Sequence, residues 1–184
     1  MNAALADLGY SVKSVFGDDL SLEELKQNYV QTGMDLARKH DAVEDMPWPL
    51  LYKELDREFP DAKFILTVRD TQGWLKSICD HFGSAPSQMQ QLTYGEEFSA
   101  PIGNEDHYCK IYEAHNEDVK AYFKDRPDDL LVLNLSEGNT WHTICEFIGV
   151  PTPDKPFPKA NTKAHRESFG YRLKAKFNKL RSKF

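Results

Sequence analysis

The chain has 184 residues, of which 40% are hydrophobic, 28% are charged and 12% are aromatic, and its formal net charge is -6. This composition is typical of one folded domain and excludes a disordered or fibrous chain, and no apolar run approaches the length of a membrane span. The negative charge argues against general nucleic-acid binding. The sequence shows no basic leader, and its three cysteines lack CxxC spacing, so we expect a cytoplasmic protein with reduced thiols.

The first third of the chain predicts helices with one short strand between them. A helix is expected over residues 2–8, ended by Gly9, and a strand over residues 11–16. Ser21 and Glu24 have the spacing of a capping box, which predicts that the next helix begins there. The following segment, residues 41–47, carries three acids and is predicted as a loop, with a short helix over residues 49–59 after it.

Residues 64–68, FILTV, form an apolar run typical of a strand inside a parallel sheet, and Arg69 falls where that strand ends. Ligands of open α/β sheets bind at such strand ends. Arg69 can offer a planar fork of donors to a phosphate, and Ser77 can add a hydroxyl from the helix predicted over residues 71–82, which Asp70 or Thr71 caps. The alternative is an arginine paired with an acidic neighbour and a solvated serine, and this fragment alone leaves both interpretations open.

The remaining pattern alternates helices with one more strand. Residues 83–103 are the least regular part and have the length of a lid or substrate loop. A helix over residues 105–124, a strand over residues 130–135 and a helix from Asn139 or Thr140 to Gly149 follow. Strands that alternate with helices predict an α/β fold, a three-layer parallel sheet flanked by helices, in a single domain over residues 1–184.

The C-terminal residues 163–184 hold eight Lys or Arg and one Glu, and their apolar residues recur at helical spacing. We interpret this segment as a basic amphipathic helix. Its apolar stripe can dock on the core of the domain, or it can bind a membrane surface or a partner groove.

Several segments together resemble the sulfotransferase family that uses 3'-phosphoadenosine 5'-phosphosulfate (PAPS). They are DMPW at residues 45–48, PDAKFILTVRD at residues 60–70, Trp74 and Ser77, His115-Asn116, LLVLNL at residues 130–135 with Gly138 and Trp141, and PFPKAN at residues 156–161. The resemblance covers nearly the whole chain. It implies a P-loop nucleoside-triphosphate-hydrolase-like fold, and transfer of a sulfuryl group from PAPS to an acceptor hydroxyl or amine.

The resemblance also assigns roles to single residues. In that family an arginine and a serine at the spacing of Arg69 and Ser77 bind the 3'-phosphate of the nucleotide, and Lys159 and Asn161 lie in a loop that reaches the nucleotide. Asp45 is the first candidate for the base that accepts the acceptor's proton, with Glu44 and His115 after it. Asp45 could instead cap a helix, and His115 could be a structural histidine.

No metal is needed for this reaction, and we expect none. Two clusters of potential ligands, at residues 40–45 and 105–107, match neither zinc nor EF-hand spacing.

The front of the chain departs from the family pattern. The family opens with a strand and a Gly-rich loop that hold the phosphosulfate, whereas this sequence starts at the helix that follows them, and it contains no Gly-Lys-Ser/Thr cradle. We expect that the fold is missing this first strand, which would lie between the strands at residues 64–68 and 130–135. Either the natural chain is longer, or the protein is a non-catalytic nucleotide-binding remnant or a protein or membrane interaction module.

Overall fold

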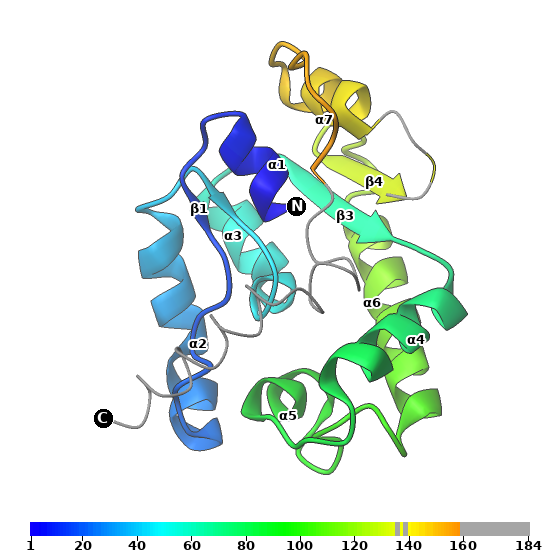
Figure 1. The fold of residues 1–184 in the computed structure, drawn as a ribbon. Coiled ribbons are helices and arrows are strands. Elements are labelled where there is room, and N and C mark those ends of the chain that lie inside the picture. The colour runs from blue at the N-terminus through cyan, green and yellow to red at the C-terminus, as the bar shows by residue number, and fades with distance from the viewer. Residues whose placement is uncertain (135–136, 138–139, 159–184) are drawn as a thin grey trace, which may run out of the picture. The chain divides into compact units, whose positions relative to one another are not determined.

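The computed structural model describes residues 1–134, 137 and 140–158 (Figure 1). Contacts between residues divide the chain into two compact units, Met1–Pro153 and Asp154–Phe184. In the second unit the description covers residues 154–158, which include no helix or strand. The architecture below is therefore that of the first unit, and the single domain over residues 1–184 stays a prediction.

Seven α-helices and four strands follow one another in the described part of the chain. In chain order they are α1 (Asn2–Asp7), β1 (Val12–Lys13), α2 (Leu22–Ala37), β2 (Ala42–Val43), a 3-10 turn (Trp48–Leu51), α3 (Tyr52–Glu58), β3 (Phe64–Val68), α4 (Thr71–Phe82), α5 (Gln88–Tyr94), α6 (Glu105–Tyr122), β4 (Leu130–Asn134) and α7 (Thr140–Ile148).

Local chemistry explains the elements that the sequence predicts best. The strand over residues 64–68 and the helix over residues 71–82 are confirmed at both ends. The carboxylate of Asp70 accepts a hydrogen bond from the Gly73 amide at 2.6 Å, which caps α4. The predicted capping box of Ser21 and Glu24 is confirmed at the start of α2.

Two segments that the sequence predicts as irregular contain short regular elements. Residues 41–47, predicted as a loop, contain the two-residue strand β2, which forms because its backbone pairs with β1. Residues 83–103 contain the helix α5, and their role as a lid or substrate loop stays a prediction. The 3-10 turn replaces the first part of the helix expected over residues 49–59.

The described strands form two small parallel sheets. β1 pairs with β2, and β3 pairs with β4 in a register that runs from Phe64 opposite Leu130 to Val68 opposite Asn134. The α/β class is therefore confirmed, while one continuous three-layer sheet is not what the described residues form. The prediction that a missing strand would lie between the strands at residues 64–68 and 130–135 is wrong. These two strands are direct neighbours, because β3 and β4 hydrogen-bond to each other.

A buried apolar cluster holds the N-terminal half of this unit together. It joins Phe16, Met34, Ala37, Trp48, Leu51 and Leu55. Trp48 lies edge-on to Phe16 at 4.8 Å between ring centroids, and its indole N–H donates to the Ser14 carbonyl at 3.0 Å. The tryptophan of the DMPW segment is thus a core anchor, which fixes the backbone directly after Asp45.

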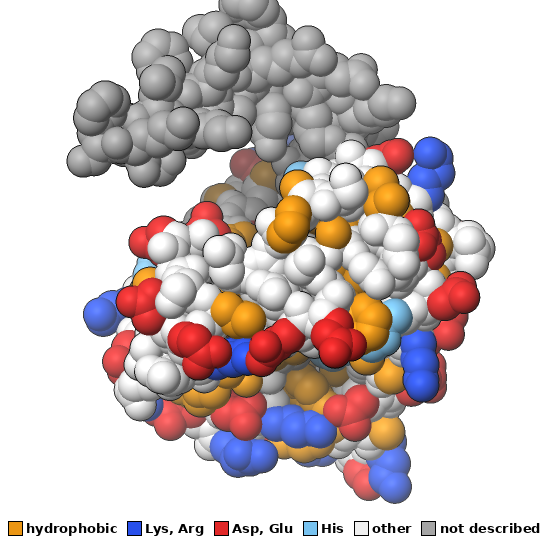
Figure 2. Space-filling model, turned by 90° about the horizontal axis from the view of Figure 1, so that it is seen from below, with side chains coloured by type: hydrophobic (Ala, Val, Ile, Leu, Met, Phe, Trp, Pro, Cys, Tyr) orange, Lys and Arg blue, Asp and Glu red, His pale blue; other side chains and the backbone are white. Residues whose placement is uncertain are grey.

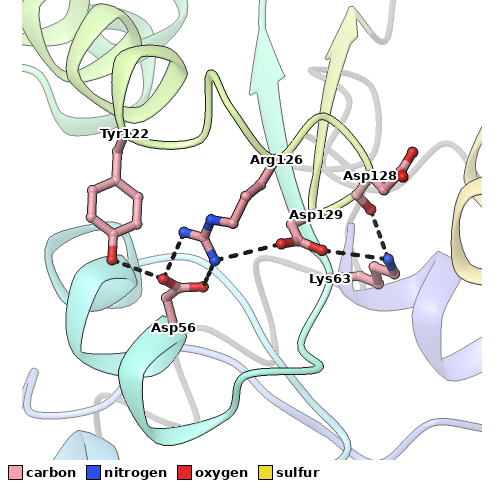
Figure 3. Close-up of polar contacts among 6 residues, drawn as sticks. All are labelled: Asp56, Lys63, Tyr122, Arg126, Asp128 and Asp129. Atoms are coloured by element: carbon pink, nitrogen blue, oxygen red, sulfur yellow. Dashed lines mark hydrogen bonds and ion pairs between the residues drawn. The ribbon is translucent and has the colours of Figure 1, made fainter.

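A polar network fastens the start of each long strand to the neighbouring helices (Figure 3). Arg126 donates to both carboxylate oxygens of Asp56, at 2.9 and 2.8 Å, and Tyr122 donates to the same carboxylate at 2.8 Å. Asp56 is only 9% exposed, and its hydrogen bonds from Arg126 are the main cause that lowers its pKa. Arg126 also pairs with Asp129, which in turn lies 3.6 Å from the ammonium of Lys63.

Figure 2 shows one face of the molecule, on which acidic and basic side chains lie interspersed among apolar ones in the described part. That face therefore presents no strong field of a single sign. Among the helices of the described ranges, none is long and apolar enough to cross a membrane.

Candidate functional site

The site is built around the residue that directly follows β3. The backbone N–H of Arg69 donates to the hydroxyl of Tyr112 at 3.1 Å, and that hydroxyl donates back to the Arg69 carbonyl at 3.2 Å. Tyr112 belongs to α6, which packs against both β3 and α4 (Figure 1). The carboxyl end of β3 is therefore held by a side chain that lies 43 positions further along the chain.

The guanidinium of Arg69 lies over the first turn of α4. A Cβ placed on Gly73 would lie only 2.8 Å from Nη2 of Arg69, so the missing side chain of Gly73 leaves the space that the guanidinium uses. Ser77 is one helical turn beyond Gly73, and residues four apart share a helix face. The guanidinium of Arg69 and the side chain of Ser77 therefore lie on the same face of α4.

Arg69 and Ser77 have few polar contacts in the part of the chain that the structure describes. Within the described residues, the guanidinium of Arg69 makes no ion pair or side-chain hydrogen bond, and the hydroxyl of Ser77 makes none either. Arg69 is exposed and Ser77 is half-buried. Within the described ranges, an arginine paired with a neighbouring acid is therefore not what the structure shows.

Aromatic packing locks the helix that carries Ser77 to α6. Trp74 stacks on Tyr112 with 4.2 Å between ring centroids and 9° between the ring planes. One turn earlier, the hydroxyl of Thr71 donates to the Glu113 carboxylate at 2.7 Å. These two contacts fix the first turns of α4, and hence the direction of the face that carries Gly73 and Ser77.

Asp45 sits in the turn that follows β2. Its backbone has φ 71°, in the left-handed region that few residues other than glycine adopt, and its carboxylate accepts from the Met46 amide at 2.8 Å. Although the residue is exposed, surrounding protein desolvates the carboxyl group and raises its pKa, the hydrogen bond from Met46 lowers it, and the charge of Glu44 raises it. No side-chain bond from Asp45 caps the 3-10 turn, so the capping interpretation is wrong.

The other two candidate bases have different surroundings. Glu44 accepts hydrogen bonds from Ser14 at 2.5 Å and Asn2 at 3.3 Å, which occupy its Oε1 atom. His115 lies edge-on to Tyr52 with 6.0 Å between ring centroids, and burial lowers its pKa while the charge of Asp118 raises it. Within the described residues, no hydrogen bond or ring contact joins His115 to Asp45 or Arg69.

The remaining predicted site residues, Lys159 and Asn161, lie outside the described residues, as does the basic segment 163–184. A search of the described ranges finds no group of three or more His, Cys, Asp or Glu side chains that could hold a metal ion.

Sequence reasoning missed two residues of this site. Gly73 and Tyr112 fall inside the helices predicted over residues 71–82 and 105–124, and the pattern gives neither of them a role in the site. A glycine in the first turn of a helix was the one available signal for Gly73. Tyr112 has no such signal, because its contact with Arg69 joins positions 43 apart.

Comparisons with known proteins show the family of the chain. A family model described as a sulfotransferase domain matches residues 1–166. A curated relative from Aspergillus versicolor, named "Ava biosynthesis cluster protein M", is 29% identical over 159 residues, which cover 71% of this chain and 60% of the relative. The chain therefore spans less than two thirds of the length of that relative. Because the family match extends over most of the sequence, the chain belongs to the sulfotransferase domain family.

Proposed function

We propose that this chain carries the 3'-phosphate subsite of a PAPS-dependent sulfotransferase. The observation that supports this most directly is the arrangement of Arg69 over Gly73, one turn before Ser77, with donors unpaired in the described residues. A guanidinium can give two parallel hydrogen bonds to a phosphate, and a serine hydroxyl can add a third. The family match supports PAPS as the co-substrate, because sulfotransferases generally use it.

The reaction would be an in-line transfer. The acceptor's hydroxyl or amine attacks the sulfur of PAPS, the bond from sulfur to the phosphate oxygen breaks, and adenosine 3',5'-bisphosphate leaves. A base takes the proton that the acceptor loses. Binding of the 3'-phosphate by Arg69 and Ser77 would hold the nucleotide still, which lowers the entropic part of the barrier.

Among the three candidate bases, Asp45 is the one that we assign this role. Among the described residues its carboxylate receives one hydrogen bond, from the adjacent backbone. Desolvation by the surrounding protein raises its pKa, which makes it a stronger base than an ordinary aspartate. Glu44 is engaged by Ser14 and Asn2, and His115 lies against Tyr52. The acceptor is a small molecule whose structure the site does not specify.

Thermal unfolding with adenosine 3',5'-bisphosphate tests the nucleotide site. A ligand at a hundred times its Kd stabilises the folded state by about 2.7 kcal/mol, which corresponds to a rise in Tm of about 5 to 10 °C for a chain of this size. We expect that rise in Tm for the protein without substitutions. Arg69→Ala should weaken binding by about tenfold or more, because charge-assisted hydrogen bonds contribute about 1.5 to 3 kcal/mol.

The matched control is Arg57→Ala, which also removes an exposed arginine. Arg57 pairs across a helical turn with Glu54 at 3.7 Å and should bind no nucleotide. The Arg57 variant should therefore keep the full rise in Tm. No rise for the natural chain, or an equal rise for the Arg69 variant, would rule out the proposed site.

A further inference from the structure

Tyr112 bonds to the backbone of the residue that directly follows β3. Among the described residues, the last pair in register between β3 and β4 is Val68 with Asn134. Side chains can satisfy backbone N–H and carbonyl groups just as a neighbouring strand does. The hydroxyl of Tyr112 bonds to both of these groups of Arg69, at 3.1 and 3.2 Å, and so holds the residue that carries the guanidinium.

The ring of Tyr112 is fixed independently of its hydroxyl. It stacks on Trp74 at 4.2 Å with nearly parallel planes. Tyr112 thus contacts the turn between β3 and α4 from both sides, through the backbone of Arg69 before the turn and through the indole of Trp74 after it. The side chain of Tyr112 therefore contacts both parts of the proposed phosphate subsite, Arg69 and the helix that carries Ser77.

The consequence for Arg69 follows from geometry. The two hydrogen bonds flank its Cα atom, so they hold the root of its side chain, while Gly73 leaves space for its charged end. A bidentate bond to a phosphate requires the guanidinium to stay within about 0.5 Å and 10 to 20° of one orientation. Rotation of the backbone at residue 69 would move the guanidinium out of that range.

We propose that Tyr112 is the positioning residue of the phosphate subsite, and that its hydroxyl sets the preference for a nucleotide with a 3'-phosphate over one without it. This inference rests on the proposed function, since it concerns the same arginine. It assigns no contact between Tyr112 and the ligand. The hydroxyl acts through the backbone of Arg69.

The test compares the affinity of the protein for two nucleotides by equilibrium titration. Adenosine 3',5'-bisphosphate carries the 3'-phosphate, and adenosine 5'-monophosphate lacks it. The variant is Tyr112→Phe, which keeps the ring stacked on Trp74 and removes only the hydroxyl. We expect its preference for the bisphosphate to fall about five- to tenfold, the loss typical of one hydrogen-bonding group, with affinity for the monophosphate unchanged.

Tyr108→Phe is the matched control. Tyr108 lies on the same helix, and its hydroxyl donates to the Phe98 carbonyl at 2.7 Å, away from Arg69. This variant should lower stability without a change in nucleotide preference. A second measurement needs no nucleotide. NMR relaxation of the Arg69 Nε–H group should report greater mobility in the Tyr112 variant than in the natural protein.

The outcomes separate the two proposals. If the natural protein binds both nucleotides equally, the proposed function fails and this inference fails with it. If the natural protein prefers the bisphosphate and the Tyr112 variant keeps the full preference, the proposed function stands and the positioning role is wrong. Unchanged mobility of Arg69 in the variant would overturn the positioning role as well.

Discussion

Asp45 combines an unusual backbone conformation with a perturbed carboxyl group. A left-handed φ of 71° costs free energy for any residue with a Cβ, although aspartate tolerates it better than most. The core position of Trp48, three residues later, holds the segment in place.

The proposed base role gives a pH-dependent prediction. Desolvation by the surrounding protein holds the pKa of Asp45 above its ordinary value. A base works only when it is deprotonated, so the rate of sulfuryl transfer should rise as the pH rises through that pKa. Asp45→Asn should lower kcat about 100- to 10,000-fold and remove this rise. Asparagine also tolerates a left-handed φ, so the backbone should be preserved. Release of adenosine 3',5'-bisphosphate measures the rate.

A matched variant is Glu44→Gln, which removes the neighbouring carboxylate. It should keep turnover within a few-fold of the natural rate, and both variants should bind the bisphosphate normally. If the Asp45 variant turned over at the rate of the unsubstituted protein, another group would have to be the base.

At the scale of elements, the exit of β3 and the start of α4 form one functional unit. The strand ends at Val68, the carboxylate of Asp70 caps the helix, and the first turn carries Gly73 beneath the guanidinium of Arg69. The phosphate subsite therefore depends on the short connection between β3 and α4, which places Arg69 beside Gly73.

Gly73→Ala tests that fit. The new Cβ would lie 2.8 Å from Nη2 of Arg69 and 2.5 Å from Oδ2 of Asp70, so both side chains must move. Alanine favours a helix over glycine by about 1 kcal/mol, which offsets a weaker cap of similar size. We expect Tm to change little and bisphosphate affinity to fall several-fold. A Tm scan and a titration on the same sample distinguish this result from general destabilisation, which would lower both.

At the scale of the molecule, the Asp56 network joins parts that are far apart in sequence. Asp56 lies on α3, Tyr122 ends α6, and Arg126 and Asp129 precede β4. Lys63 connects Asp129 to the start of β3. The network fixes where β3 and β4 begin, and hence where their carboxyl ends and Arg69 lie.

Asp56→Asn should destabilise the fold by about 1 to 3 kcal/mol, less than for a fully buried pair because Arg126 is 40% exposed. Hydrogen bonds from Arg126 lower the pKa of Asp56 in the folded state. The ionised carboxylate therefore stabilises the fold fully above the unfolded pKa of about 3.9, and this stabilisation is lost as the pH falls through the lower folded pKa. Urea unfolding between about pH 6 and 3 should show this acid-dependent loss in the natural protein and a smaller one in the variant.

Asp61→Asn serves as the control for this series, since Asp61 is exposed. Its stability and acid dependence should match those of the natural protein. Equal acid sensitivity of the Asp56 variant and the natural protein would show that other carboxylates cause the loss.

The sequence by itself determined the elements whose signals are local. The run FILTV with Arg69 after it, the caps at Ser21 and Asp70 and the family motifs depend on neighbouring residues, and they predicted β3, α2, α4 and the candidate arginine and serine. Only the tertiary structure decided that β3 pairs directly with β4, that two residues within an acidic segment form β2, and that Tyr112 holds Arg69. Strand pairing and side-chain contacts join residues that are distant in sequence. They stabilise the protein only once folding has brought those residues together, so no local pattern in the sequence reports them.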